Sequence, residues 1–304
     1  MYYLIYGFLY VLSLLPGFIL YALGDSISFL VYHIIGYRRK VVLENLRIAF
    51  PEKTESERKK IAKQFYRNFI ESFIETIMLL SMSDRRLQKM FVGDVTLLNE
   101  IAARGNNVQL HAIHQFNWEV LNINVSRQLR GITFLGVYMP ISNKAFDRIF
   151  RDLRTRGGTV LIPATHFKSN FLTMNYNPYL LGLAADQSPA TPHNAYWVNF
   201  FNRPTAFVTG PEKAARLRNT AVVFVNFYKV TRGKYTIDTH FVTDAAALLP
   251  EGDLTIRYAR FIEETIRKRP DNYLWSHRRW KHKYKEEYKT SVLEPLNLDA
   301  GEQK

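Results

Sequence analysis

Over residues 95–267, segments in which apolar residues recur at helical spacing alternate with short apolar runs of strand length. Helical spacing of apolar residues predicts helices over 97–104, 118–129, 144–155 and 254–267. Short apolar runs predict strands over 108–113, 132–137, 159–163, 180–185, 221–228 and 235–241. Strands that alternate with helices are typical of a sheet covered on both faces. The pattern therefore predicts an α/β fold with a mainly parallel or mixed central sheet flanked by helices.

The N-terminal region consists of long apolar stretches instead of this periodic pattern. Residues 1–24 carry no charged side chain. This stretch is long enough to cross a bilayer, which takes roughly 20 residues. Pro16–Gly17 interrupts this stretch, so a kinked span and a shallow hairpin are both compatible with it. A second apolar stretch, 26–37, ends at Arg38, Arg39 and Lys40, and these charges favour a cytoplasmic side for the rest of the chain. The alternative is an aromatic-rich hairpin packed on the domain.

A long helix is expected after this region. Thr54 and Glu57 match a capping box, and apolar residues then recur every fourth position at Ile61, Phe65, Phe69, Phe73 and Ile77. The mixed charges beside this face favour a core position. We therefore divide the chain into an N-terminal hydrophobic helical membrane segment (1–40), an α/β domain (41–290) and a polar C-terminal tail (291–304).

Composition limits the kinds of active site that this chain can form. The chain has 304 residues, of which 47% are hydrophobic and 14% aromatic, enough for one large α/β domain or two small ones. Cysteine is absent, which excludes a disulfide framework, a thiolate nucleophile and a Cys-ligated metal. We find no phosphate-binding loop and no zinc-ligand spacing, so we predict neither a metal nor a cofactor.

Charge indicates the kind of partner. The formal net charge is +14, which suits nucleic acid, an anionic membrane or an acidic carrier protein. The basic, aromatic run 267–285 fits nucleic acid through phosphate contacts and stacking. It also fits an acidic carrier protein or phosphorylated lipid headgroups, with Trp275 and Trp280 at the interface. Because the N-terminal stretch is apolar, we predict a membrane partner and no nucleic acid.

Candidate chemistry lies in HQFNWE, residues 114–119, between a predicted strand and a predicted helix. An imidazole such as His114 titrates near neutrality and can remove a proton from a hydroxyl. A carboxylate such as Glu119 can hold the other ring nitrogen protonated. The helix start also offers free N–H groups to an anion. The alternative is that His114 and Glu119 are polar surface residues that face solvent and have no catalytic role. His111, within the strand, is interpreted as structural.

Other polar residues follow predicted strands or open a helix. Ligands of α/β sheets bind beyond the carboxyl ends of the strands, where His114, residues 163–166 and Asp186 fall. Asp186, with Gln187, is either a turn residue or one that orders the site or binds the acceptor. Glu212 follows a Gly-Pro helix start, which can present backbone donors to an anion.

Six blocks of the chain resemble, in order, the bacterial lipid A biosynthesis lauroyl/myristoyl acyltransferase family of the glycerolipid acyltransferase superfamily. They are RRKVVLENLRIAFPEKTESER (38–58), HQFNWE (114–119), GVYMPISNKAFDRIFRDLRTRGG (136–158), AADQSP (184–189), FFNRPTAFVTGPEKAAR (200–216) and NYLWSHRRWK (272–281). Three positions depart from the usual pattern: Phe116 and Asn202 replace glycine, and Met139 replaces arginine. These departures concern the acceptor and the chain preference more than the reaction.

The resemblance implies a membrane-bound acyltransferase of lipopolysaccharide biosynthesis, on the cytoplasmic side of the inner membrane. It would move a fatty acyl group from an acyl carrier protein or coenzyme A thioester to a hydroxyl of a lipid A precursor, an anionic lipid. His114 would be the base and Glu119 its orienting partner. Substrate binding would fall to Asn117, Arg156, Asp186, Gln187, Arg203 and Glu212, with Arg156 binding phosphate.

Two alternatives remain at the level of the sequence. The same chemistry can act on another glycolipid, an aminolipid or a phospholipid, since the site would be shared. A non-catalytic basic protein that binds membrane lipid would have the same charge and the same apolar N-terminus, without any need for His114.

Overall fold

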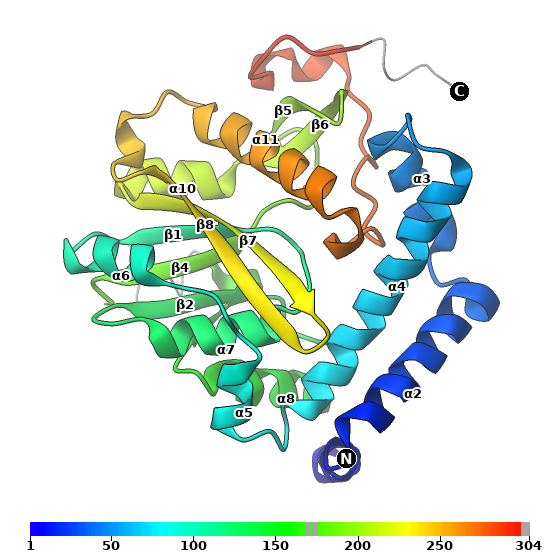
Figure 1. Ribbon diagram of the computed structural model, residues 1–304. Helices are drawn as coiled ribbons and strands as arrows, with labels where there is room; N and C mark the ends of the chain where they lie inside the picture. Colours follow the sequence, from blue (N-terminus) through cyan, green and yellow to red (C-terminus); the bar gives the residue numbers. More distant parts are fainter. Residues whose placement is uncertain (168–170, 172–175, 299–304) are drawn as a thin grey trace.

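The computed structural model describes residues 1–167, 171 and 176–298. At its centre is a six-stranded sheet of order β3-β2-β4-β1-β7-β8 (Figure 1). Neighbouring strands are parallel except for β8, which forms an antiparallel hairpin with β7. The strands are β1 (Val108–Ala112), β2 (Thr133–Tyr138), β3 (Val160–Pro163), β4 (Tyr179–Ala184), β7 (Ala221–Thr231) and β8 (Lys234–Thr243). The predicted mainly parallel sheet is confirmed.

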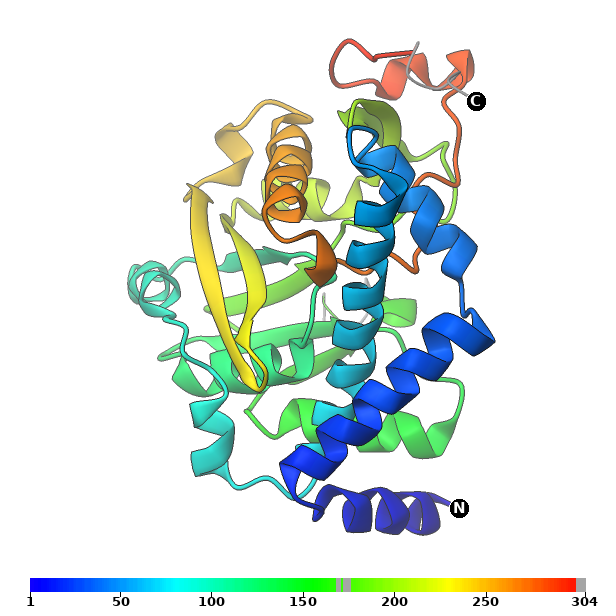
Figure 2. The ribbon, with the colours of Figure 1, turned by 45° about the vertical axis from the view of Figure 1, so that its right-hand side comes forward.

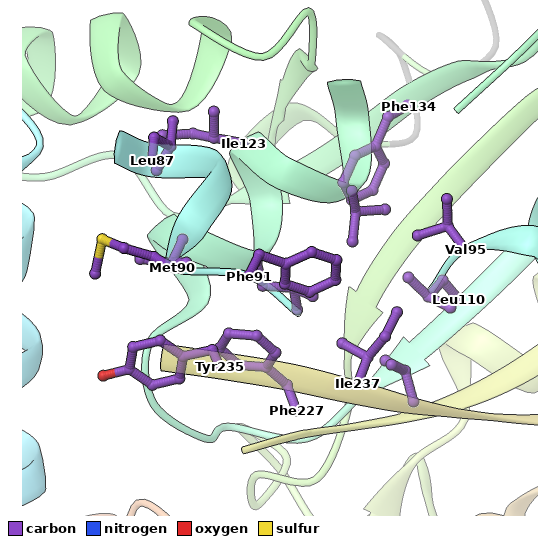
Figure 3. Packing of buried hydrophobic residues seen from close by; sticks show 14 of the residues in the cluster. Leu87, Met90, Phe91, Val95, Leu110, Ile123, Phe134, Phe227, Tyr235 and Ile237 are labelled. Atoms are coloured by element: carbon purple, nitrogen blue, oxygen red, sulfur yellow. The ribbon is translucent and has the colours of Figure 1, made fainter. Parts of the chain in front are cut away.

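Helices cover both faces of this sheet, because the side chains of each strand point alternately to opposite faces. On β7, Val223 and Val225 join the core under α7 and α8, whereas Val222 and Phe224 join the core under α10 and α11. Figure 3 shows part of the first core, where Met90 and Phe91 lie near Tyr235 of β8. The helices are α5 (Asp84–Lys89), α6 (Thr96–Ala103), α7 (Trp118–Gln128), α8 (Lys144–Thr155), α10 (Gly210–Arg218) and α11 (Asp253–Lys268). The elements predicted over 97–267 agree with these bounds to within three residues.

A second, two-stranded sheet was not expected from the sequence. Strands β5 (Ala195–Phe200) and β6 (Arg203–Val208) form an antiparallel hairpin. Its turn residues Phe201 and Asn202 have φ values of 51° and 60°, and the usual Asn-Gly turn signal is absent. The first part of the predicted tail packs on this hairpin, where Leu293 N donates to the Trp197 carbonyl at 3.1 Å.

Helix α4 (Glu55–Met78) is the longest helix and contributes to both cores. It follows α3 (Arg39–Ala49) and begins with the predicted capping box, in which Thr54 N donates to Glu57 Oε2 at 2.7 Å and Glu57 N donates to Thr54 Oγ1 at 3.3 Å. Of the apolar face predicted for it, Phe65 is fully buried but Phe73 is 47% exposed. The face is therefore only partly a core face.

The N-terminal segment forms α1 (Tyr2–Ser13) and α2 (Gly17–Leu30), which continues as a π-helical turn over Val31–Ile35. The break before Gly17 is as predicted, and α2 runs on from the first apolar stretch into the second. Asp25 lies within the helix, where its carboxylate pairs with Arg67 at 2.9 Å and with Arg232 at 2.7 Å. Helix α2 runs alongside α4 (Figures 1 and 2). By length and composition alone, Gly17–Ile35 can cross a membrane.

Candidate active site

The sheet register brings two distant polar residues together. Strands β1 and β4 are parallel neighbours in which Ala112 pairs with Ala184. His114 and Asp186 each follow these partners by two residues, so they leave the sheet side by side at its carboxyl edge. His114 Nδ1 lies 2.6 Å from Asp186 Oδ1, and the backbone N–H of His114 donates to the same oxygen at 3.2 Å. The prediction of polar residues meeting at this edge is confirmed for this pair.

Asp186 is buried, yet its environment favours the charged form. Burial alone would raise the pKa of this carboxyl, but the charge of His114 and the hydrogen bonds from its ring and backbone outweigh burial and hold the pKa below its usual range. A carboxylate at Nδ1 keeps that nitrogen protonated, which leaves Nε2 to accept a proton. The His114 side chain is 20% exposed and packs edge-on against Trp118, with ring centres 5.0 Å apart.

Glu119 has a different partner from the one predicted. Its carboxylate accepts hydrogen bonds from Arg154 Nε at 3.0 and 3.1 Å and from Arg154 Nη2 at 2.6 Å. No ion pair within 4.0 Å joins Glu119 to His114, both of which lie in the described part of the chain. The prediction that Glu119 orients His114 is therefore wrong. The reason is geometric: Glu119 lies in the first turn of α7 and faces α8, whereas β4 supplies the carboxylate at the ring.

Asn117 caps a helix and bonds a buried carboxylate. Its Oδ1 accepts from Glu119 N at 3.1 Å and so caps α7, and its Nδ2 donates to Glu75 Oε2 at 3.1 Å. Glu75 is fully buried, and it also accepts from Tyr235 at 2.5 Å and from Tyr21 at 3.0 Å. Burial raises the pKa of Glu75. Because both ends of the amide are engaged, the predicted substrate-binding role of Asn117 is not favoured.

Arg156 and Glu212 also hold the fold together. Arg156 donates to the carbonyls of Leu79 and Met82 at 2.8 and 2.5 Å and pairs with Asp84 at 2.7 Å. These contacts at the end of α4 engage both terminal nitrogens, so the predicted phosphate-binding role is not favoured. Glu212 is buried in α10, where it accepts hydrogen bonds at the start of α11 from Gly252 N, from Thr255 N at 2.9 Å and from the Thr255 hydroxyl at 2.5 Å. Glu212 thus caps α11, and its predicted substrate-binding role is not favoured.

Three further predictions have mixed outcomes. Gln187 lies half-buried after Asp186, and Arg203 begins β6 opposite Phe200; their substrate-binding roles stay predictions. His111 is buried against the rings of Phe224 and Tyr258, and burial lowers its pKa to about 3. Its structural interpretation is confirmed.

The predicted basic run 267–285 is more buried than expected. Trp275 is fully buried and Arg279 is 1% exposed, so neither belongs to a surface patch. Arg279 donates to the Ala206 carbonyl at 2.8 Å and lies 4.2 Å from the centre of the Phe207 ring. In the same segment, the N–H of Leu274 donates to the His114 carbonyl at 3.0 Å. This segment therefore packs beneath the site and holds the backbone of His114 in place. The predicted position of Trp275 at an interface is wrong, because Trp275 is buried.

A cavity of about 330 Å³ opens at the carboxyl edge of the sheet. Its lining includes the polar side chains of His114, Glu119 and Arg154. The rest is mainly apolar and includes Leu110, Ile113, Leu121, Phe134, Val137, Leu161, Leu183 and Phe227. Its size falls within the range of small-molecule sites, and its walls suit a hydrocarbon chain. Sequence reasoning missed Arg154, although it stands in the 136–158 block, two residues before Arg156.

The Arg154–Glu119 pair gives a stability prediction. Arg154→Ala should lower the free energy of unfolding by about 3 kcal/mol, since it leaves the buried Glu119 carboxylate unpaired while Arg154 itself is partly exposed. Urea unfolding measures this. Arg148→Ala is the matched control on α8, because its ion pair with Asp152 is exposed and should contribute no more than about 1 kcal/mol. Equal unfolding midpoints for the two variants would contradict the structural importance of the buried pair.

Comparisons with known proteins point to one family. The sequence model of the family described as "Bacterial lipid A biosynthesis acyltransferase" matches residues 1–282. The chain is similar to the lipid A biosynthesis lauroyltransferase of Escherichia coli K12, with 24% identity over 278 residues that cover 90% of this chain and 89% of the relative. It is 22% identical to the E. coli lipid A biosynthesis palmitoleoyltransferase over 280 residues, again 90% and 89% of the two chains. A lipid A biosynthesis acyltransferase of Haemophilus influenzae is 26% identical over 275 residues, 88% of this chain and 86% of that one.

The family match extends from the N-terminal helices through the buried segment behind His114, and so takes in every element that builds the cavity. The chain thus belongs to the bacterial lipid A biosynthesis acyltransferase family and is an acyltransferase.

Proposed function

We propose that this acyltransferase moves a fatty acyl group from a thioester to a hydroxyl group of a lipid A precursor, in lipopolysaccharide biosynthesis. The donor is acyl carrier protein or coenzyme A carrying the acyl chain. The observation that supports this most is that His114, paired with Asp186, lines a largely apolar cavity. The pair supplies a base, and the apolar walls supply a place for the chain.

The proposed reaction proceeds by general base catalysis. Nε2 of His114 takes the proton of the acceptor hydroxyl as its oxygen attacks the thioester carbonyl carbon. The tetrahedral oxyanion then collapses and expels the thiolate, which takes the proton back from the imidazolium. Asp186 stabilises that imidazolium through Nδ1–H. Because the thioester is already activated, this reaction uses neither a metal nor a cofactor.

Arg154 replaces Arg156 as the proposed cationic group of the site. Its Nε and Nη2 are held by Glu119, which fixes the direction of the guanidinium. Its Nη1 remains to donate to the oxyanion or to a phosphate of the lipid. A preorganised donor of this kind stabilises developing charge without reorganisation during the reaction. In this proposal Glu119 acts by positioning Arg154.

Membrane attachment through residues 1–40 is part of the proposal, with the α/β domain on the cytoplasmic side of the inner membrane. Helices α1 and α2 and the π-helical turn expose a run of large apolar side chains, namely Tyr3, Leu4, Phe8, Val11, Leu14, Phe18, Leu23, Phe29, Ile34 and Ile35. Exposed apolar surface of this extent is typical of a membrane contact. Arg38, Arg39 and Lys40 come directly after it and favour the cytoplasmic side.

Mass spectrometry of cellular lipids after deletion of the gene tests the acceptor. We expect lipid A that lacks one acyl chain, and purified protein should add that chain to the isolated precursor when given the acyl thioester. Unchanged lipid A with one acyl chain missing from another glycolipid, aminolipid or phospholipid would move the assignment to that lipid. Failure to transfer to any of these acceptors would favour a non-catalytic lipid-binding protein.

A further inference from the structure

A groove of about 430 Å³ lies between α2 and α4, outside the catalytic cavity. The two helices run side by side in both ribbon views, with α2 dark blue and α4 light blue in Figure 2. Phe29, Tyr32 and His33 line the groove from α2 and its π-helical turn. Lys60, Lys63 and Arg67 line it from α4, at spacings that place them on one face of that helix. The groove therefore has an aromatic wall and a cationic wall.

The two lysines are not neutralised by protein carboxylates. Asp25 also lines the groove, but its carboxylate is held by Arg67 and Arg232. Neither Lys60 nor Lys63 takes part in an ion pair within the described ranges, whereas the neighbouring Lys59 pairs with Glu55 at 2.5 Å. Lys63 Nζ lies 5.9 Å from the centre of the Tyr32 ring. Two adjacent ammonium groups are thus available to an anion.

The surface beside the groove is apolar. Phe29 is 58% exposed, and Ile34 and Ile35, in the turn after it, are 70% and 68% exposed. Lysines at the edge of such a surface can lay their methylene stems along it while the ammonium stays in water. A nucleic acid would use the cations but would leave these isoleucines uncovered. A phospholipid satisfies both, with its phosphate on the lysines and its acyl chains beside the isoleucines.

We propose that this groove binds the phosphate headgroup of an anionic phospholipid in the bilayer. The proposal rests on the membrane attachment put forward above and adds a specific lipid site to it. Each basic side chain near an anionic surface strengthens binding roughly five- to sixfold, so the two lysines together account for roughly a 30-fold preference at low salt. The site would hold α2 and α4 at a set height on the membrane.

Vesicle binding by the purified full-length chain tests the site. The vesicles contain phosphatidylcholine alone or phosphatidylcholine mixed with phosphatidylglycerol. We expect the unmodified chain to bind both and to prefer the anionic vesicles, with the two lysines accounting for roughly 30-fold of that preference. The double variant Lys60→Gln/Lys63→Gln should show a preference that is weaker by roughly this factor and still bind neutral vesicles through the apolar surface. Because both lysines are exposed, the fold should be unaffected, as circular dichroism can verify.

The matched control is Lys268→Gln/Lys283→Gln, which removes two exposed lysines away from the groove and changes the net charge equally. It should retain the preference for anionic vesicles. Equal loss in both double variants would overturn the site in favour of general charge attraction, and so would an unchanged preference in the groove variant. Inorganic phosphate at constant ionic strength should not displace the vesicles, and displacement would indicate a site for free anions instead.

These outcomes separate the groove from the proposed function. Binding to neutral vesicles with no dependence on Lys60 and Lys63 overturns the groove alone and leaves membrane attachment intact. No binding to either kind of vesicle overturns the attachment and the groove together, and leaves acyl transfer to be judged by the transfer assay.

Discussion

Replacement of His114 by Ala is expected to lower the rate of acyl transfer by about 10²–10⁴-fold, the usual loss when a general base is removed. The side chain is partly exposed and lines the cavity, so its removal should leave the fold and membrane attachment unchanged. Initial rates of the purified variant, with an acyl thioester and the lipid acceptor, measure the loss. Thermal unfolding by circular dichroism verifies that the variant is folded.

A second histidine provides the control. His240 lies in β8, is not buried and is not among the residues that line the catalytic cavity. His240→Ala should therefore retain the wild-type rate under the same conditions. Wild-type turnover by folded His114→Ala would show that the proton is removed by some other group, and the proposed mechanism would then be abandoned.

Replacement of Asp186 by Asn is expected to have the second largest effect, a loss of about 10²–10⁴-fold in kcat. The amide carries no charge to stabilise the imidazolium, and it can present an N–H to Nδ1 and so select the wrong tautomer. Glu119→Gln is the informative comparison, since the hydrogen bond between Asp186 and His114 stays in place. Steady-state kinetics of both variants should show the larger kcat loss for Asp186→Asn. A larger loss for Glu119→Gln would restore the partner predicted from the sequence.

Asp186 also predicts a dependence of stability on pH. Its pKa is lower in the folded chain than in the unfolded one, so the unfolded chain binds the proton more readily. The stabilisation is fully present above the ordinary carboxyl pKa of about 4 and is lost as the pH falls through the lowered pKa. Urea unfolding from about pH 6 downward should show the stability difference between wild type and Asp186→Asn shrinking. A constant difference would contradict the lowered pKa.

Local signals accounted for most of the fold. The strand and helix order over residues 97–267, the capping box at Thr54 and the interruption before Gly17 are all short-range features, and the structure has them. The β5–β6 hairpin had no such signal. Its turn uses Phe201 and Asn202 at positive φ, and residues of this kind do not predict a tight turn as glycine does.

The candidate site also has one part that local sequence predicts and another that only the folded sheet brings together. A histidine at the end of a buried strand is a local feature, and His114 was identified from it. The carboxylate that reaches His114 depends on the strand order, because β4 and β1 are neighbours only in the folded sheet. Glu119, five residues away in the chain, faces α8 instead. Proximity in the sequence was therefore a poor guide to the partner.

Arg154 in α8 and Arg156 at its C-terminal end also show that sequence proximity does not predict which side chains share a site. Arg154 and Arg156 are two residues apart, so on a helical path they point in nearly opposite directions. The first reaches Glu119 and the cavity, and the second clamps the end of α4. By itself, the sequence determined the α/β class, the family resemblance and the choice of His114 as the candidate base, because these depend on local periodicity and on short blocks. Only the tertiary structure decided which charged side chains share the site, because strand order and helix packing set those distances.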